Sequence, residues 1–295
     1  MDNQSRYPKK DYCWWAMKLL PYRTNGIWLS CQIWTPFAKE ALAREAQTAF
    51  WFGIGEMKLE EYIQQFSLDE VLAIEYSDKQ FIVLQSARNH INSQKDTDKE
   101  LFVFLILQCA LVWFQIAGSG PLWREEFAQK IEKDWIILQE LQYNNVDRWY
   151  DFLITSRYNK RLYNNKRKRL EKFVMVYNDL VQYVSLLDHH NNMFAFRNNL
   201  SDAMKQHPHN KTMAFAIKMY GYGARIVTKN FISYPMDIVI PLDSRLRKIY
   251  TEQYSDTNST DHEIVTYYQQ LAKTNNIAPL HLDSLIWIDY REKYG

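Results

Sequence analysis

Cysteine, glycine and proline are all scarce in this sequence. The 295 residues include three cysteines, Cys13, Cys31 and Cys109, whose odd number and wide spacing support neither a disulfide framework nor a four-cysteine zinc or iron–sulfur site. Because there are only eight glycines and eight prolines, helices can run without interruption and extended disorder is not expected. The cysteine usage fits an intracellular, reducing compartment, which is the cytoplasm or nucleoid, or the nucleus in a eukaryote.

Long apolar runs are scarce as well. The N-terminus, MDNQSRYPKKDYCWW, contains no apolar stretch of the length that a signal peptide needs. The longest run, residues 101–118, approaches the lower length limit for a membrane span, but Gln108 and Gln115 interrupt it and charged, amphipathic sequence follows. We therefore predict a buried core helix here and no membrane partner.

Helical periodicity is what the sequence has in abundance. Apolar spacing predicts an all-α fold, with an N-terminal extension of unknown role at residues 1–79 and a helical domain at residues 80–295. Ser67 and Glu70 have the Ser–x–x–Glu spacing of a capping box. The best strand candidate is DIVIPL, residues 237–242. The expected helices cover residues 39–53, 67–76, 80–94, 100–117, 121–142, 165–187, 211–226, 243–254, 261–274 and 279–291.

Positive charge is concentrated in one segment, although the formal net charge is only +2. The sequence RYNKRLYNNKRKRLEKF, residues 157–173, holds eight basic residues against one acid, with two tyrosines interleaved. This composition is typical of a surface that follows the phosphates of a nucleic acid. A solvated helix face is the alternative that the segment leaves open.

One lysine stands in an apolar, helix-prone stretch. In MAFAIKMYGYGA, residues 213–224, Lys218 is the single charged residue. One reading is that its methylenes run along apolar surface while the amine reaches water. The other reading is that the amine is desolvated, so that it stays neutral and nucleophilic near pH 7.

A carboxylate follows at the start of another expected helix. In IPLDSR, Asp243 stands at the N-cap position, where capping alone would contribute about 1 kcal/mol. A functional role is also open, because opening a glycosidic bond with an amine requires a carboxylate. The carboxylate accepts a proton and stabilises the charge that develops on the sugar, and the amine attacks C1′ to give a Schiff base.

Three motifs in order, AFAIKM, IPLDSR and PLHLDSLIW, together resemble the archaeal GO glycosylases, a branch of the helix–hairpin–helix DNA glycosylase superfamily. The resemblance covers residues 80–295 and includes the basic segment. It implies a two-subdomain helical fold with a catalytic cleft between the subdomains. It also implies a bifunctional enzyme that excises 8-oxoguanine from DNA and then cleaves the abasic strand, with Lys218 as the Schiff-base lysine and Asp243 as the catalytic aspartate.

The resemblance further implies a set of DNA contacts. A base rotated out of the duplex needs aromatic faces to stack on and polar groups that read its edge. Asp283 and Trp287 lie four residues apart, which sets an acceptor beside an aromatic plate on one helix face; a surface acid and a core tryptophan are the alternative. By resemblance the base contacts are Gln85, Trp123, Tyr222, Asp283 and Trp287. The charge of the basic segment makes Lys160, Arg161, Lys166, Arg167 and Lys168 the expected DNA-backbone contacts.

One region departs from the superfamily pattern. The usual glycine-bracketed turn before the lysine is absent, and the sequence reads KQHPHNKTMAFAIK at residues 205–218. We expect no metal and no other cofactor. We also expect a monomer whose partner is DNA containing 8-oxoguanine. Two alternatives stay open: a glycosylase of the same fold for another damaged purine, such as an alkylated one, and a non-catalytic nucleic-acid-binding helical protein.

Overall fold

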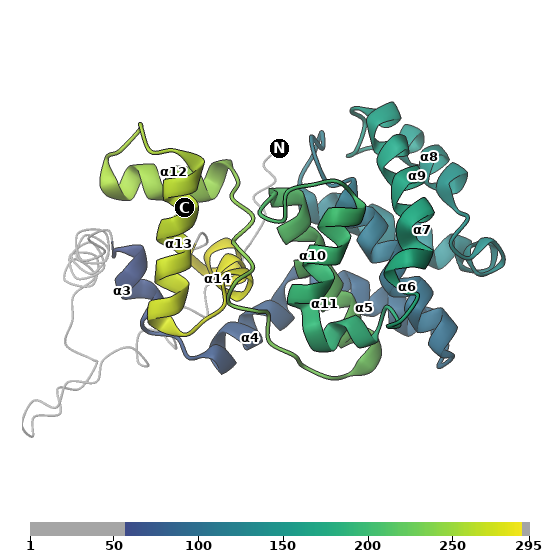
Figure 1. Cartoon of the computed structure of the whole chain (residues 1–295), viewed down its shortest axis with the longest axis horizontal. Helices are drawn as coiled ribbons and strands as arrows, with labels where there is room; N and C mark the ends of the chain where they lie inside the picture. Colours follow the sequence, from purple (N-terminus) through teal and green to yellow (C-terminus); the bar gives the residue numbers. More distant parts are fainter. Residues whose placement is uncertain (1–56, 291–295) are drawn as a thin grey trace, which may run out of the picture. The chain divides into compact units, whose positions relative to one another are not determined.

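The computed structural model describes residues 57–290, and every regular element in this range is helical (Figure 1). The predicted all-α fold is confirmed, whereas the helix expected at residues 39–53 lies outside the described residues. Ser67 caps α4 and Glu70 returns a bond to the Ser67 backbone, so the predicted capping box is confirmed. The elements are α3 (Leu59–Ile63), α4 (Leu68–Ser77), α5 (Lys79–Ile91), α6 (Asp96–Leu111), α7 (Gly120–Leu141), α8 (Val146–Thr155), α9 (Tyr163–Leu180), the 3₁₀ helix η1 (Asp188–Asn192), α10 (Met193–Ala203), α11 (Lys211–Thr228), α12 (Ser244–Tyr254), α13 (Asp261–Asn275), α14 (Pro279–Leu285) and the π-helical turn η2 (Ile286–Tyr290).

The longest apolar run forms the central helix of the fold. Every residue of α6 from Leu101 to Leu111 is buried, and α11 packs along it. Gln108, which interrupts the run, is also buried; its amide donates to Asn145 at 2.8 Å and accepts from the Trp149 indole at 2.6 Å. The predicted core helix is therefore confirmed, and within the described part of the chain no helix combines the length and apolar composition of a membrane span.

The helix ends before the apolar run does. Its periodicity predicts a helix to residue 117, but α6 stops at Leu111, where the Arg169 guanidinium donates to the Leu111 carbonyl at 3.2 Å. The Asn159 amide donates in the same way to the Val112 carbonyl at 3.4 Å. These donors satisfy carbonyls that the end of a helix leaves without an intrahelical partner.

The strand prediction for residues 237–242 is wrong. The segment is a linker, in which the Ile238 N–H bonds to the Pro235 carbonyl and the Leu242 N–H bonds to the Ile240 carbonyl. Ile238 is buried in one hydrophobic cluster and Ile240 in the other, so the apolar residues of this segment serve two cores and not one face of a sheet. Residues 236–238 form a turn, so the segment does not run straight as a strand would.

The apolar side chains form two hydrophobic clusters. The larger one is built mainly from α5 to α11, and the smaller one joins α3 and α4 to α12, α13 and α14. Leu59, Tyr62 and Val71 belong to the smaller cluster, and residues 57–290 belong to one folded unit. The domain boundary expected after residue 79 therefore falls inside this unit. The helices before residue 79 bury their apolar faces against the C-terminal helices.

Two glycines in α11 allow its neighbours to approach closely. A Cβ atom on Gly221 would lie 2.4 Å from the Tyr234 ring, and one on Gly223 would lie 2.9 Å from Ile106 of α6. The missing side chain lets Tyr234 lie against the helix, where its hydroxyl donates to the Lys218 carbonyl at 2.7 Å. Glycine inside a helix lowers its stability, but at these two positions it permits the close contacts that position α11.

Candidate active site

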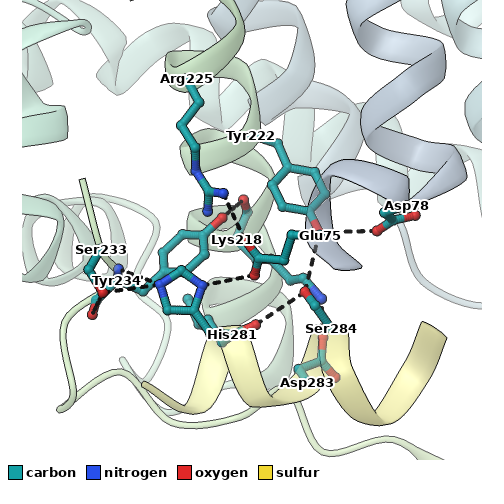
Figure 2. Close-up of polar contacts among 11 residues, drawn as sticks. Glu75, Asp78, Lys218, Tyr222, Arg225, Ser233, Tyr234, His281, Asp283 and Ser284 are labelled. Carbon is teal, nitrogen blue, oxygen red and sulfur yellow. Dashed lines mark hydrogen bonds and ion pairs between the residues drawn. The ribbon is translucent and has the colours of Figure 1, made fainter. Parts of the chain in front are cut away.

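Lys218 lies in the middle of α11 and is almost fully buried, with 3% of its surface exposed. Its Nζ atom donates to the Oδ2 atom of Asp283 on α14 at 2.5 Å (Figure 2). The Asp283 side chain keeps 16% exposure, so this contact lies just beneath the surface. The apolar helix does not lift the amine into water; it directs the amine to a carboxylate that comes from a helix of the smaller hydrophobic cluster.

Asp243 caps α12, as its sequence position predicts. Its Oδ1 atom accepts the backbone N–H groups of Arg245 at 2.9 Å and Leu246 at 3.0 Å, and its side chain is one quarter exposed. Among residues 57–290, no ion pair joins Lys218 to Asp243, because the lysine is paired with Asp283. The carboxylate that the amine contacts is therefore a different one from the carboxylate that caps the helix.

The two aspartates and the lysine influence one another electrostatically. Burial raises the pKa of Asp283, the charge and hydrogen bond of Lys218 oppose this rise, and the charges of Asp243 and Asp78 add to it. The pKa of Asp283 lies above the ordinary aspartate value as a result. A carboxylate with a raised pKa is a better proton acceptor than an exposed aspartate.

Trp287 follows α14 in the turn η2 and is partly exposed. The Arg245 guanidinium covers one face of its indole, with Cζ 3.7 Å from the ring centroid. A guanidinium at this distance forms a cation–π contact. Since Arg245 also lies 3.5 Å from the Oδ2 atom of Asp243, it links the expected catalytic aspartate to the expected stacking residue.

Tyr222 lies one turn after Lys218 and is fully buried. Its hydroxyl donates to the Asp78 Oδ2 atom at 3.1 Å and lies 3.2 Å from the Ser284 Oγ atom. Burial raises the pKa of Tyr222 well above the ordinary tyrosine value. In this conformation Tyr222 links α11 to α14 and to the start of α5, and its ring has no exposed face.

The last two expected base contacts lie in different surroundings. Trp123 on α7 is fully buried and packs edge-on against Trp113, with ring centroids 4.8 Å apart. Gln85 is partly exposed on α5, and no hydrogen bond within residues 57–290 joins it to Lys218 or the two aspartates. The structure therefore brings Lys218 and Asp283 into contact and leaves Trp123 and Gln85 without a direct link to them.

Sequence analysis missed a buried polar cluster beside the lysine (Figure 2). Arg225 of α11 donates to the Oε2 atom of Glu75 on α4 at 2.6 Å, and the Nδ1 atom of His281 on α14 lies 2.9 Å from the Oε1 atom of Glu75. Glu75 and His281 are fully buried and Arg225 is 3% exposed. One signal was available, because Arg225 interrupts the same apolar helix two turns after Lys218.

The charge of Glu75 is strongly favoured in this cluster. Burial by itself raises the pKa of Glu75, but the hydrogen bond from His281 and the charges of Arg225 and Lys218 oppose this rise, and the pKa is lowered to about 2. Glu75 is therefore ionised at neutral pH.

Among residues 57–290, no group of three or more histidine, cysteine, aspartate and glutamate side chains is placed to hold a metal ion.

The basic segment is not uniformly exposed, and one of the expected DNA-backbone residues, Lys166, lies in the core. Lys166 is fully buried, donates to Asn159 and lies 5.1 Å from the Phe114 ring centroid. Burial, with a smaller effect of Arg161, lowers the pKa of Lys166 to about 8. The residue lies on the inner face of α9, so in this conformation it does not reach solvent or a phosphate.

The other four basic side chains divide into one paired and three exposed residues. Arg167 forms ion pairs with Asp147 at 2.7 Å and Glu171 at 2.8 Å. The side chains of Lys160, Arg161 and Lys168 are exposed. These three are the members of the expected set that this conformation offers to a phosphate backbone.

Replacing Lys160, Arg161 and Lys168 together with glutamine is expected to weaken binding to damaged and undamaged DNA alike. The slope of log affinity against log salt should fall by up to about 2.7, or about 0.9 for each phosphate that the variant no longer neutralises. Fluorescence anisotropy across a salt series measures both effects. Lys166→Gln is the matched control, and a slope change in that variant would mean that the buried lysine reaches the DNA after all.

Comparisons with known proteins place this fold in a class. The all-helical fold is similar to the crystal structure of 8-oxoguanosine-complexed Pa-AGOG, the 8-oxoguanine DNA glycosylase from Pyrobaculum aerophilum, with a TM-score of 0.62 over 77% of this chain and 84% of that one. At 22% sequence identity this likeness concerns the fold alone. The class defined in this way is a structural one, an all-helical fold shared with that protein.

The sequence comparisons are more specific. The AGOG family of N-glycosylase/DNA lyases matches residues 60–293. An N-glycosylase/DNA lyase of Methanococcus maripaludis is 36% identical over 213 residues, which cover 71% of this chain and 77% of that protein. One from Thermococcus kodakarensis is 33% identical over 231 residues, which cover 78% of this chain and 82% of that protein.

The chain belongs to the AGOG family and is an N-glycosylase/DNA lyase. The predicted family and enzyme class are confirmed. The family match begins at residue 60, which agrees with the packing of α3 and α4 into the same folded unit. The alternative of a non-catalytic nucleic-acid-binding protein is set aside, because the family is one of enzymes.

Proposed function

We propose that this N-glycosylase/DNA lyase excises 8-oxoguanine from DNA and cleaves the resulting abasic strand through a Schiff base on Lys218. The observation that carries the proposal is a buried amine, 2.5 Å from the Asp283 carboxylate, in a chain of this family. The similar fold of Pa-AGOG, a protein whose crystal structure contains 8-oxoguanosine, supports the choice of lesion.

The chemistry begins with a proton transfer. The Lys218 ammonium gives a proton to the Asp283 carboxylate, whose raised pKa and direct contact support this role. The neutral amine attacks C1′ and the C1′–N9 bond breaks, so the base leaves with the bonding electrons and takes up a proton. Asp243 stabilises the positive charge that develops on the sugar.

Strand cleavage follows from the same covalent bond. The sugar ring opens as the bond between C1′ and the ring oxygen breaks, and the lysine nitrogen becomes the nitrogen of a Schiff base. Loss of a proton from C2′ then expels the 3′ phosphate by β-elimination, because the iminium group accepts the electrons. No cofactor is needed for either step.

Recognition of the lesion rests on one proton. Guanine N7 is an acceptor, whereas 8-oxoguanine carries an N7–H donor, so an acceptor at that point distinguishes the two bases by about 1–3 kcal/mol in a site closed to water. Asp283 and Gln85 offer side-chain acceptors. Trp287 supplies the stacking face, with the base in the place that the Arg245 guanidinium occupies in this conformation.

The proposed function is tested with the wild-type protein and three duplexes that differ in one base. Borohydride is added to the protein with an oligonucleotide that contains 8-oxoguanine, an alkylated purine or guanine. We expect a covalent adduct and a β-elimination product with the 8-oxoguanine duplex alone. An adduct with the alkylated purine but not with 8-oxoguanine would refute the proposed lesion and favour a glycosylase of the same fold for another purine.

Trp287→Ala should separate base recognition from strand cleavage. Loss of base stacking, worth about 1–3 kcal/mol, predicts an 8-oxoguanine excision rate about 5- to 150-fold lower in single-turnover assays. Cleavage of a preformed abasic site should change little, because that substrate has no base to stack. Equal losses on both substrates would show that Trp287 maintains the site instead of reading the base.

A further inference from the structure

The buried cluster of Glu75, Arg225 and His281 joins the two helices that carry the reacting pair. Arg225 lies seven residues after Lys218 on α11, and His281 lies two residues before Asp283 on α14. The Glu75 carboxylate binds both side chains, one with each oxygen. The cluster therefore links α11 to α14 through α4, close to the contact between Lys218 and Asp283 (Figure 2).

His281 extends this link to the linker that leads to Asp243. The backbone N–H of Tyr234 donates to the His281 Nε2 atom at 3.2 Å, and the Ser233 hydroxyl lies 3.1 Å from the same atom. Because a backbone N–H can only donate, Nε2 must be the acceptor, and the ring proton is then on Nδ1 and points to Glu75. A single neutral tautomer satisfies both contacts.

Tyr234 connects this network to the backbone of Lys218. Its hydroxyl donates to the backbone carbonyl of Lys218 at 2.7 Å, and its ring lies against Gly221 of the same helix. The backbone of the reacting lysine is thus held by the same linker residue that binds His281. Four segments of the chain meet in one hydrogen-bonded network: α4, α11, the linker before Asp243, and α14.

A polar network at this place fixes how the helices are aligned along one another, which apolar packing does less strictly. A buried ion pair adds little net stability, because desolvation of both charges opposes their attraction. Its directional bonds do fix register, whereas apolar helix faces tolerate small shifts. A shift of one residue along a helix is about 1.5 Å, which is enough to separate a contact such as that of Lys218 with Asp283.

We propose that Glu75, Arg225 and His281 are positioning residues for the reaction, which set the register of α14 against α11 and so hold Asp283 against the Lys218 amine. The inference rests on the proposed function in one respect, the role of Lys218 as nucleophile. All three side chains are buried, and the proposal gives none of them a contact with the DNA or the base. Their effect is expected on the rate constant of covalent bond formation and not on DNA affinity.

The experiment uses a double variant that removes the network while sparing the fold. Glu75→Leu with Arg225→Met replaces a buried ion pair by apolar groups, which often leaves stability unchanged. We expect its single-turnover rate of borohydride-trapped adduct formation to fall about 100-fold, as for a misplacement of about 1 Å. The dissociation constant for the lesion duplex should stay within a factor of about 3, which separates positioning from binding.

A pair of variants at one position provides the rescue test. His281→Asn keeps a side-chain donor near Glu75, whereas His281→Leu removes it, and both lose the acceptor for Tyr234. The asparagine variant should retain a clearly higher rate constant than the leucine variant. Gln108→Leu is the structural control, because it breaks a buried hydrogen-bond network on α6 and should lower the melting temperature without changing the rate constant.

The possible results are separated by the active fraction, which is titrated with trapped DNA for each protein. A wild-type rate constant in the folded double variant would overturn the proposal. The same holds if the variants lose only active fraction, as expected of a merely structural role. Failure of the wild-type protein to form any adduct would instead refute the proposed function.

Discussion

Replacing Lys218 with glutamine is expected to abolish the borohydride-trapped adduct, the release of 8-oxoguanine and the cleavage of the abasic strand. The reason is that the amine is the group that forms the covalent bond. Glutamine keeps much of the length of the stem and can still donate to Asp283, so the contact between α11 and α14 is preserved. The loss should therefore exceed any effect of folding. Gel electrophoresis of trapped complexes and a thermal melt of the same preparation measure the two quantities separately.

Lys166 provides a demanding control for this prediction. Within residues 57–290 it is the one other buried lysine, and its lowered pKa of about 8 makes it a rival nucleophile on chemical grounds. It lies on α9 beside Asn159 and Phe114, away from the two aspartates, so Lys166→Gln should keep the adduct. Loss of the adduct in Lys166→Gln but not in Lys218→Gln would transfer the nucleophilic role to Lys166.

Asp243→Asn is expected to lower single-turnover excision by about 10²- to 10³-fold, which is the usual cost of removing one group that stabilises charge in the transition state. The cap of α12 should survive, because the bonds from Arg245 and Leu246 both end on one oxygen that asparagine retains, and asparagine and aspartate cap about equally well. The affinity for lesion DNA should be unchanged. What disappears is the negative charge beside the sugar.

Thr260→Ala is the matched control for the cap of a helix. Thr260 caps α13 with a capping box and has no expected chemical role. Its replacement should cost about 1 kcal/mol, which corresponds to about 2–4 °C in melting temperature, with an unchanged rate constant. If Asp243→Asn behaves like this control, with a change in stability alone, then Asp243 is a cap and nothing more.

Much of the fold could be predicted because its determinants are local. The capping box of Ser67 and Glu70 and the N-cap Asp243 act within one helical turn. The apolar run at residues 101–111, which Gln108 alone interrupts, can be satisfied only by a helix in the core. Sequence analysis missed the short helices α3, α8 and α10. It also predicted a strand for the linker at residues 237–242, because a short apolar run whose side chains enter two cores has the composition of a buried strand.

The sequence supplies candidate site residues one by one, but it does not supply their contacts. An amine in an apolar helix singled out Lys218, and three ordered motifs added Asp243 and Asp283. The sequence does not say which carboxylate meets the amine, because Lys218 and Asp283 are 65 positions apart. Glu75 and His281 are 206 positions apart, and neither has a local pattern that marks it as a member of a buried cluster.

The sequence by itself determined the helical class, the core helix, the family resemblance and the choice of Lys218 as the candidate nucleophile. Each of these depends on neighbours within a turn or on a motif. Tertiary structure decided which charges are desolvated and which meet. Lys166 and Lys168 stand two positions apart in one basic run, yet one is buried and the other exposed, because α9 turns one face to the core. Periodicity names the face of a helix that is buried, but the partner, and with it the chemistry, is set by what packs against that face.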